Sequence, residues 1–125
     1  MRKKVLIVSA TYYEDFSKHL EMWSIKHLDN ERIKNKIIQV PGVFEIPVVI
    51  SKNIKKYDGF IALGCVIKGE TPHFDLISKA AIDGIMKLSI EHKKPIGNGI
   101  ITCLNKTQAL DRKEKGYEAA SAVLS

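Results

Sequence analysis

Uninterrupted apolar runs constrain the fold of this chain more than any other feature. Residues 4–10 (KVLIVSA) and 58–66 (DGFIALGCV) carry few polar side chains. Such runs are typical of parallel strands, because helices cover both faces of a parallel sheet and leave no face for polar residues. Two further runs, at 36–40 and 96–102, bring the number of expected strands to four.

Amphipathic segments lie between and after these strands. Residues 14–29, a segment from about Glu45 and residues 72–92 place apolar side chains at helical spacing. Asn105 is predicted to cap a short helix, and KGYEAASAVL forms a last one. Strands that alternate with helices predict an α/β fold, with a mostly parallel sheet flanked by helices. No repeat, low-complexity tract or linker interrupts the pattern, so residues 1–125 are predicted to form one domain.

The net charge of +6 comes from lysines that are scattered along the sequence in small groups. No Arg-rich or aromatic-interleaved stripe is present, so we expect no nucleic-acid partner. A general attraction for phosphorylated metabolites is the milder expectation.

The cysteines and the hydropathy pattern indicate where the protein works. Cys65 and Cys103 form neither a CxxC pair nor a metal-binding spacing, and reduced thiols are the usual state in the cytoplasm. The apolar run near the start is too short for a signal peptide, and no segment approaches a membrane span. We therefore expect a cytoplasmic protein without a membrane partner.

Ligands of parallel α/β sheets bind beyond the carboxyl ends of the strands. One loop there reads VIKGETPHFD, in which Thr71 is a good N-cap and Pro72 suits the first helical position. His73 then falls in the first helical turn, beside backbone N–H groups that favour an anion. A structural histidine is the plainer interpretation of His73 alone.

Two other loops at this edge carry unusual residues. PGVFEIP places Phe44 and Glu45 between two prolines, either as a stiff turn or as a surface presented to a ligand. Tyr12 and Tyr13 follow the first strand and suit either packing or stacking on a planar ring. Together with the basic DRKEK segment around Arg112, these features suit a planar polar molecule and a phosphate. A GxGxxG fingerprint and a P-loop are both absent from the sequence.

Three motifs, PGVFEIP, ALGCVIKGETPHFD and GNGIITCLNKTQALDR, resemble in order and spacing those of the lumazine synthase family. The resemblance covers nearly the whole chain. It implies a flavodoxin-like three-layer α/β/α fold with a four-stranded, mostly parallel sheet. It also implies the penultimate step of riboflavin biosynthesis, catalysed without a metal or redox cofactor. In that step 5-amino-6-(D-ribitylamino)uracil condenses with 3,4-dihydroxy-2-butanone 4-phosphate to give 6,7-dimethyl-8-ribityllumazine, phosphate and water.

The same resemblance assigns the site residues. The substrate-binding set is Tyr12, Val43, Phe44, Glu45, Cys65, Val66, Ile67, Glu70, Thr71, Asn98, Arg112 and Lys115. His73 matches the family's proton donor. Tyr12 would stack on the pyrimidine, residues 43–45 and 65–67 would hold the ring and the ribityl chain, and the backbone at 70–71 would meet the phosphate.

The family also implies a homopentamer with sites between neighbouring subunits, and riboflavin synthase as a downstream partner. Arg112 matches the phosphate-binding arginine, while Asn98 and Lys115 would complete the site from the neighbour. The first strand begins soon after Met1 and leaves no arm for capsid assembly, so an isolated ring of roughly 70 kDa is expected from a 14.0 kDa chain.

This sequence departs from the family pattern in several places. Thr11-Tyr12-Tyr13 replaces the usual Arg-Phe-Asn, Asn98 stands where some members carry an aromatic residue, and only two residues separate Arg112 from Lys115. The main alternative is a flavodoxin-like binding or shell-forming protein without turnover. A nucleotide-binding transferase ranks third, because its phosphate loops are missing.

Overall fold

The computed structural model describes residues 3–68, 73–103 and 115–124. Four parallel strands form one sheet in the order β2-β1-β3-β4. The strands are β1 (Lys4–Ala10), β2 (Lys34–Val40), β3 (Gly59–Ile67) and β4 (Ile96–Cys103). The prediction of four mostly parallel strands is confirmed, and all three pairings are parallel.

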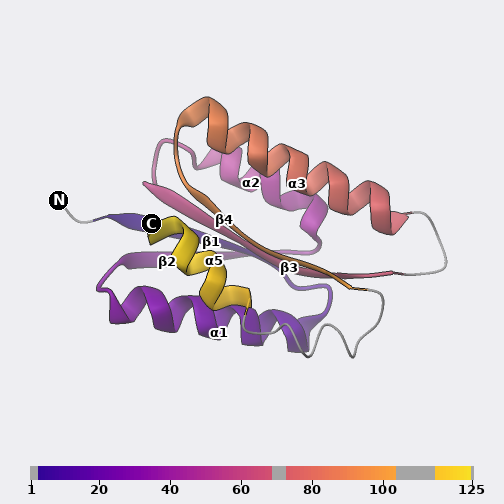
Figure 1. Ribbon diagram of the computed structural model, residues 1–125, viewed down its shortest axis with the longest axis horizontal. Helices are drawn as coiled ribbons and strands as arrows, with labels where there is room; N and C mark the ends of the chain where they lie inside the picture. The colour runs from indigo at the N-terminus through magenta and orange to yellow at the C-terminus, as the bar shows by residue number, and fades with distance from the viewer. Residues whose placement is uncertain (1–2, 69–72, 104–114, 125) are drawn as a thin grey trace.

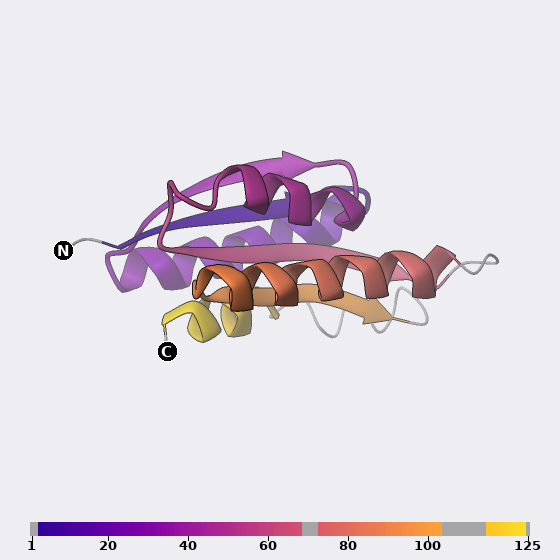
Figure 2. The same ribbon diagram turned by 90° about the horizontal axis from the view of Figure 1, so that it is seen from above.

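Helices cover both faces of the sheet (Figure 1). One face carries α1 (Glu14–Asn30) and α5 (Lys115–Leu124). The other carries the 3₁₀ turn η1 (Val43–Glu45), α2 (Ile46–Lys52) and α3 (His73–His92). Figure 2 shows the same two helical layers with the sheet between them, so the predicted three-layer α/β/α architecture is confirmed.

Two apolar clusters, one on each face, form the core. Alternate residues of β1 and β3 face opposite sides: Ile7 and Ile61 pack under α1 and α5, whereas Leu6 and Phe60 pack under α2 and α3. All four side chains are fully buried. This two-sided burial is the physical reason for the uninterrupted apolar runs, because neither face of a central strand meets water.

The element boundaries agree with the sequence prediction to within about one residue, apart from two larger differences. β2 begins at Lys34 rather than at residue 36, because an edge strand keeps one side open and tolerates exposed lysines. The helix expected from about Glu45 is divided into η1 and α2, with Pro47 in the first turn of α2. The helix predicted after Asn105 lies outside the described residues.

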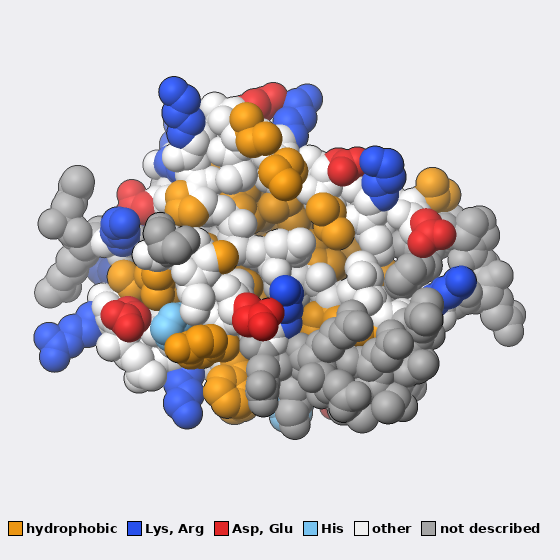
Figure 3. All heavy atoms as spheres, viewed as in Figure 1, with side chains coloured by type: hydrophobic (Ala, Val, Ile, Leu, Met, Phe, Trp, Pro, Cys, Tyr) orange, Lys and Arg blue, Asp and Glu red, His pale blue; other side chains and the backbone are white. Residues whose placement is uncertain are grey.

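Side chains on the surface are mixed in character. On the face seen in Figure 3, Lys and Arg side chains stand mostly along the outline, with apolar side chains between them. None of the helices in the described part of the chain is both long enough and apolar enough to cross a membrane.

Candidate substrate site

Ligands of parallel α/β sheets bind in a crevice at the topological switch point, which the strand order places at the carboxyl ends of β1 and β3. The chain leaves β1 toward one outer strand and reaches β3 from the other face of the sheet, so β1 and β3 flank the topological switch point. Pairing between them ends at Ser9 and Leu63, whereas β3 and β4 remain paired as far as Ile67 and Cys103. Residues 65–67 therefore extend past the end of β1. A step forms there, next to the loop that carries Tyr12.

The turn η1 is held at this step by close packing on β3. Val43 is only 4% exposed and lies in the core cluster under α2 and α3. A Cβ atom at Gly64 would lie 2.5 Å from Val43 Cγ1 and 3.2 Å from the Cβ of Ala10. Glycine at position 64 thus allows the turn to approach the sheet and fixes the position of the next two residues.

Those two residues, Phe44 and Glu45, face the surface. The Phe44 side chain is 64% exposed, although phenylalanine is usually buried. Glu45 is half-buried, and its Oε2 lies 3.5 Å from where a Cβ at Gly42 would be. The turn therefore leaves an aromatic ring and a carboxylate accessible at the surface.

The two tyrosines after β1 have different surroundings. Tyr12 is 77% exposed, whereas Tyr13 is half-buried and packs against the core cluster under α1 and α5. Their rings meet edge to face, with centroids 4.9 Å apart and planes at 83°, and Tyr13 also lies 6.3 Å from the Phe16 ring. Burial raises the pKa of Tyr13, so its phenol stays neutral. Tyr13 packs against the core and contacts the Tyr12 ring, which stays exposed. The sequence alone did not indicate which of the two tyrosines is the packing residue.

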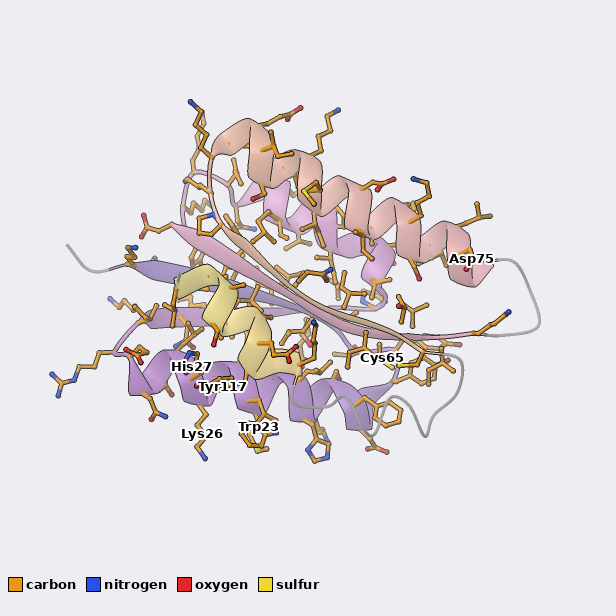
Figure 4. The ribbon with its side chains drawn as sticks, in the orientation of Figure 1. Trp23, Lys26, His27, Cys65, Asp75 and Tyr117 are labelled. Atoms are coloured by element: carbon orange, nitrogen blue, oxygen red, sulfur yellow. The ribbon has the colours of Figure 1, made fainter. Side chains whose placement is uncertain are left out.

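The end of β3 offers mainly backbone to the crevice. The Cys65 side chain points into the cluster under α1 and α5, and burial raises the pKa of its thiol to about 12 (Figure 4). Val66 packs toward the opposite face and Ile67 packs against the Cys65 cluster, each half-buried. A thiolate is therefore absent at neutral pH, and a ligand would meet Cys65 through its N–H or C=O.

The helix α3 is described from His73, and its predicted first residue, Pro72, lies outside the described residues. The side chain of His73, like all of Glu70, Thr71 and Arg112, lies outside the described residues. Asp75, which the sequence argument left out, stands exposed in the first turn (Figure 4). Its carboxylate complements the helix dipole and lies at the same end as the expected phosphate position.

Two of the expected site residues lie apart from this crevice. Asn98 is exposed on the edge strand β4, opposite Ala62, and its Oδ1 accepts a hydrogen bond of 3.0 Å from the Ile100 N–H. Lys115 begins α5, on the face of the sheet opposite Phe44, and its Nζ lies 3.1 Å from Glu118 Oε2. Within one chain the fold therefore brings together residues 12, 43–45 and 65–67, but not Asn98 or Lys115.

Comparison with known proteins adds the decisive observation to this geometry. Residues 2–125 match the family model of 6,7-dimethyl-8-ribityllumazine synthase. The chain belongs to this family. The lumazine synthase of Bartonella tribocorum is 42% identical over 134 residues, covering 99% of this chain and 89% of that protein. The Cutibacterium acnes lumazine synthase is 38% identical, covering 98% of this chain and 78% of that protein.

A solved structure shares the architecture alone. The crystal structure of a putative lipoprotein from Peptoclostridium difficile 630 superposes with a TM-score of 0.57 at 11% identity, covering 97% of this chain and 95% of that one. The α/β fold is thus not restricted to lumazine synthases, and the functional conclusion depends on the family match and the site.

Proposed function

We propose that this chain is a lumazine synthase, a transferase of riboflavin biosynthesis. It condenses 5-amino-6-(D-ribitylamino)uracil with 3,4-dihydroxy-2-butanone 4-phosphate to 6,7-dimethyl-8-ribityllumazine, phosphate and water. The family match over residues 2–125 carries this proposal. The exposed aromatic and carboxylate groups at the switch point supply a fitting surface.

The pyrimidine is proposed to bind between Tyr12 and the turn η1. Tyr12 offers a ring face, and the edge-to-face contact with Tyr13 limits its motion. Glu45 offers carboxylate oxygens, which accept hydrogen bonds from hydroxyl or ring N–H groups. The backbone of residues 65–67 supplies further donors and acceptors at the step beside β1. Phe44 covers the apolar part of the bound molecule.

The phosphate of the second substrate is proposed to bind at the start of α3. The N-terminus of a helix attracts an anion by about 0.3–1 kcal/mol, through unpaired N–H groups and the helix dipole. The backbone at Glu70 and Thr71 would meet the phosphate, with the Glu70 side chain turned away because like charges repel. Arg112 would add a bidentate contact from the neighbouring subunit.

The reaction needs proton transfers and a fixed arrangement of two substrates. The 5-amino group attacks the ketone and a Schiff base forms with loss of one water. Phosphate is then eliminated, and the ribitylamino nitrogen attacks the remaining carbonyl carbon, which closes the ring with loss of a second water. His73 is proposed to move protons in these steps, an assistance of about 10²–10⁴ in rate. Holding both substrates in one crevice supplies the larger share, because it replaces a bimolecular encounter.

We further propose that the working unit is a homopentamer with its sites between subunits. Tyr12 and Phe44 are too exposed within one chain to enclose a ligand, which supports completion of the site by a neighbour. The exposed side chains of Val48, Leu76, Met86 and Ile90 on α2 and α3 give apolar area for such contacts. Asn98, Arg112 and Lys115 are the proposed contributions of the second subunit. Riboflavin synthase would then consume the product.

A direct assay tests the function. Purified protein is mixed with both substrates, and lumazine formation is followed by absorbance and fluorescence. We expect turnover by the wild type. Phe44→Ala should reduce turnover because it removes the proposed apolar cover of the ligand, and it should leave the fold intact because the exposed ring makes few contacts within its own chain. Tight binding of the pyrimidine without product would instead favour the non-catalytic binding protein. Absence of both binding and product from a folded oligomer would contradict the proposal.

A further inference from the structure

The edge of the sheet opposite the substrate crevice collects positive charge. Every strand starts at this edge, and a basic pair or cluster accompanies each start. The cations of this basic edge are Lys3, Lys4, Arg32, Lys34, Lys36, Lys52, Lys55, Lys56, Lys93 and Lys94. On the left of Figure 3, where the strands of Figure 1 begin, Lys and Arg side chains stand out at several points.

Few carboxylates lie at the same edge. Asp29 and Glu31 lie at the end of α1, Asp58 precedes β3, and Glu91 lies near the end of α3. Ten cations against four carboxylates account for the whole net charge of +6. The remaining Lys and Arg of the sequence equal its remaining Asp and Glu in number, so the charge is concentrated at one end of the fold rather than spread over it.

The lysines of the helices differ from those of the basic edge in their pairing. Lys18, Lys79 and Lys87 each lie within 4.0 Å of a carboxylate one helical turn away. Within the described part of the chain, no cation of the basic edge has such a partner. Unpaired charges that stand close together repel one another, so their gathering costs stability that a polyanion would restore.

Two cations of the edge are held in place by the fold. Lys94 Nζ donates hydrogen bonds to the carbonyl oxygens of Ile54 and Tyr57, at 2.5 and 2.9 Å. Lys4 Nζ stands 5.0 Å from the centre of the Tyr57 ring. Neither contact neutralises the charge, and both fix it near the centre of the edge.

Helix ends explain only part of this accumulation. Four described helices, α1, α2, α3 and α5, finish at the edge, and their partial negative charge attracts nearby cations such as Lys52 and Lys93. Lys3, Lys34 and Lys36, by contrast, belong to the starts of β1 and β2 rather than to a helix end.

The character of the edge indicates the kind of partner. Segments 3–4, 31–36, 52–58 and 93–95 contain no exposed large apolar side chain, whereas the centre of a protein–protein interface is apolar. Lysine supplies a compact charge that suits single phosphates. Four strands spaced about 4.8 Å apart spread these charges over about 14 Å, enough for several phosphates of an extended strand.

We propose that the basic edge binds the sugar–phosphate backbone of a nucleic-acid strand without sequence preference. No exposed aromatic side chain of these segments is available to stack on bases. Binding is therefore electrostatic and falls steeply with salt. This revises the expectation from the sequence, where the same lysines are far apart and no stripe is visible.

A matched pair of variants tests the proposal on the full-length oligomer. The edge variant combines Lys34→Gln, Lys55→Gln and Lys93→Gln; the control combines Lys18→Gln, Lys79→Gln and Lys87→Gln. Each removes three positive charges, and all six lysines are exposed and lie outside the substrate crevice. The probe is a fluorescein-labelled oligouridylate of about twenty nucleotides, and its binding is followed by anisotropy from about 25 to about 200 mM salt.

We expect the edge variant to bind the probe at least tenfold more weakly at low salt. Its slope of log affinity against log salt should be shallower by about 2, since each lost phosphate contact removes about 0.7. The control should change affinity less than threefold, and both variants should keep their melting temperature and lumazine-forming activity. If both variants lose the same affinity for the probe, the binding depends on the overall charge of the protein and not on the basic edge, and the proposal is overturned.

Competition experiments separate the other polyanions. Binding to polyglutamate or to vesicles with anionic headgroups, without binding to the oligouridylate, would overturn the nucleic-acid assignment and indicate an acidic peptide or a membrane surface. Activity of the wild type is measured alongside, so a failed proposal for the edge remains distinct from a failed proposal for the crevice.

Discussion

Tyr12 and Tyr13 are adjacent in the chain, identical in chemistry and opposite in surroundings. In the part of the chain that the structure describes, the exposed ring of Tyr12 has one aromatic neighbour, the edge of Tyr13, which in turn lies beside Phe16. We therefore propose that Tyr13 is a positioning residue, which acts on a ligand through Tyr12. The sequence identified both tyrosines but did not show which one is buried and which is exposed. Side chains alternate between the two faces of a sheet only within a strand, and both tyrosines follow the end of β1.

Replacing Tyr13 tests this division. In Tyr13→Leu the edge-to-face contact is lost, a contact that contributes about 0.5–1.5 kcal/mol. We expect the KM for the ribitylaminouracil to rise about two- to tenfold, while the KM for the butanone phosphate stays within twofold. Tyr13→Phe keeps the ring and should behave like the wild type. Equal changes in both KM values would show that Tyr13 serves general stability instead.

Cys65 gives a prediction about pH. Burial raises the pKa of its thiol in the folded protein to about 12, from an ordinary value of 9.0. Below pH 9 both states carry the proton; above it the unfolded state loses the proton first, so stability falls as pH rises. Urea unfolding from pH 8 to 11 should show a steeper loss for the wild type than for Cys65→Ala, by at most about 1.4 kcal/mol per pH unit. Parallel curves for the two proteins would show that Cys65 does not titrate differently on unfolding.

At the scale of elements, the turn η1 depends on a glycine in the neighbouring strand. Gly64 admits Val43, and any side chain there would displace the turn that carries Phe44 and Glu45. Gly59, at the other end of β3, makes a similar close contact far from the crevice: a Cβ there would lie 2.8 Å from Val123 Cγ1. The two glycines form a natural comparison within one strand.

We expect Gly64→Ala and Gly59→Ala to lower the free energy of unfolding by a comparable amount, about 1–3 kcal/mol, because both overpack the core. Only Gly64→Ala should also weaken binding of the pyrimidine, measured by titration at a temperature where both variants are folded. If Gly59→Ala weakens binding as much, the effect belongs to the whole sheet and not to the turn.

Elements were more predictable than their contacts. β1 and α5 have the predicted limits, because an apolar run buried on both faces and a compact amphipathic segment leave few alternatives. The sequence did not predict that the Cys65 side chain faces the cluster under α1 and α5. The residues of β3 around it are all apolar, so no alternation of polar and apolar residues distinguishes the two faces of the strand. The clustering of the lysines could not be predicted without the strand order, because that order places residues distant in sequence at one edge of the sheet.

At the scale of the whole molecule, the residues expected in the site lie in separate parts of one chain. Tyr12, Phe44 and the start of α3 lie at the carboxyl edge of the sheet, whereas Asn98 lies on the outer strand and Lys115 on the opposite face. An arrangement of this kind suits a ring in which one face of each subunit meets a different face of the next. Each site would then combine His73 of one subunit with Arg112 of its neighbour.

Mixed rings test that assignment. His73→Ala and Arg112→Ala rings are each expected to have low activity, because every interface carries one defect. When the two chains are refolded together in equal amounts, random assembly gives about one interface in four with both wild-type halves and about one in four with both defects. Activity should therefore rise above that of either parent ring, toward about a quarter of the wild type. Native mass spectrometry verifies mixing and the intact assembly of each parent. Verified mixed rings that gain no activity would place both residues in the site of one subunit, since in that case no redistribution of chains can bring a wild-type His73 and a wild-type Arg112 into the same crevice.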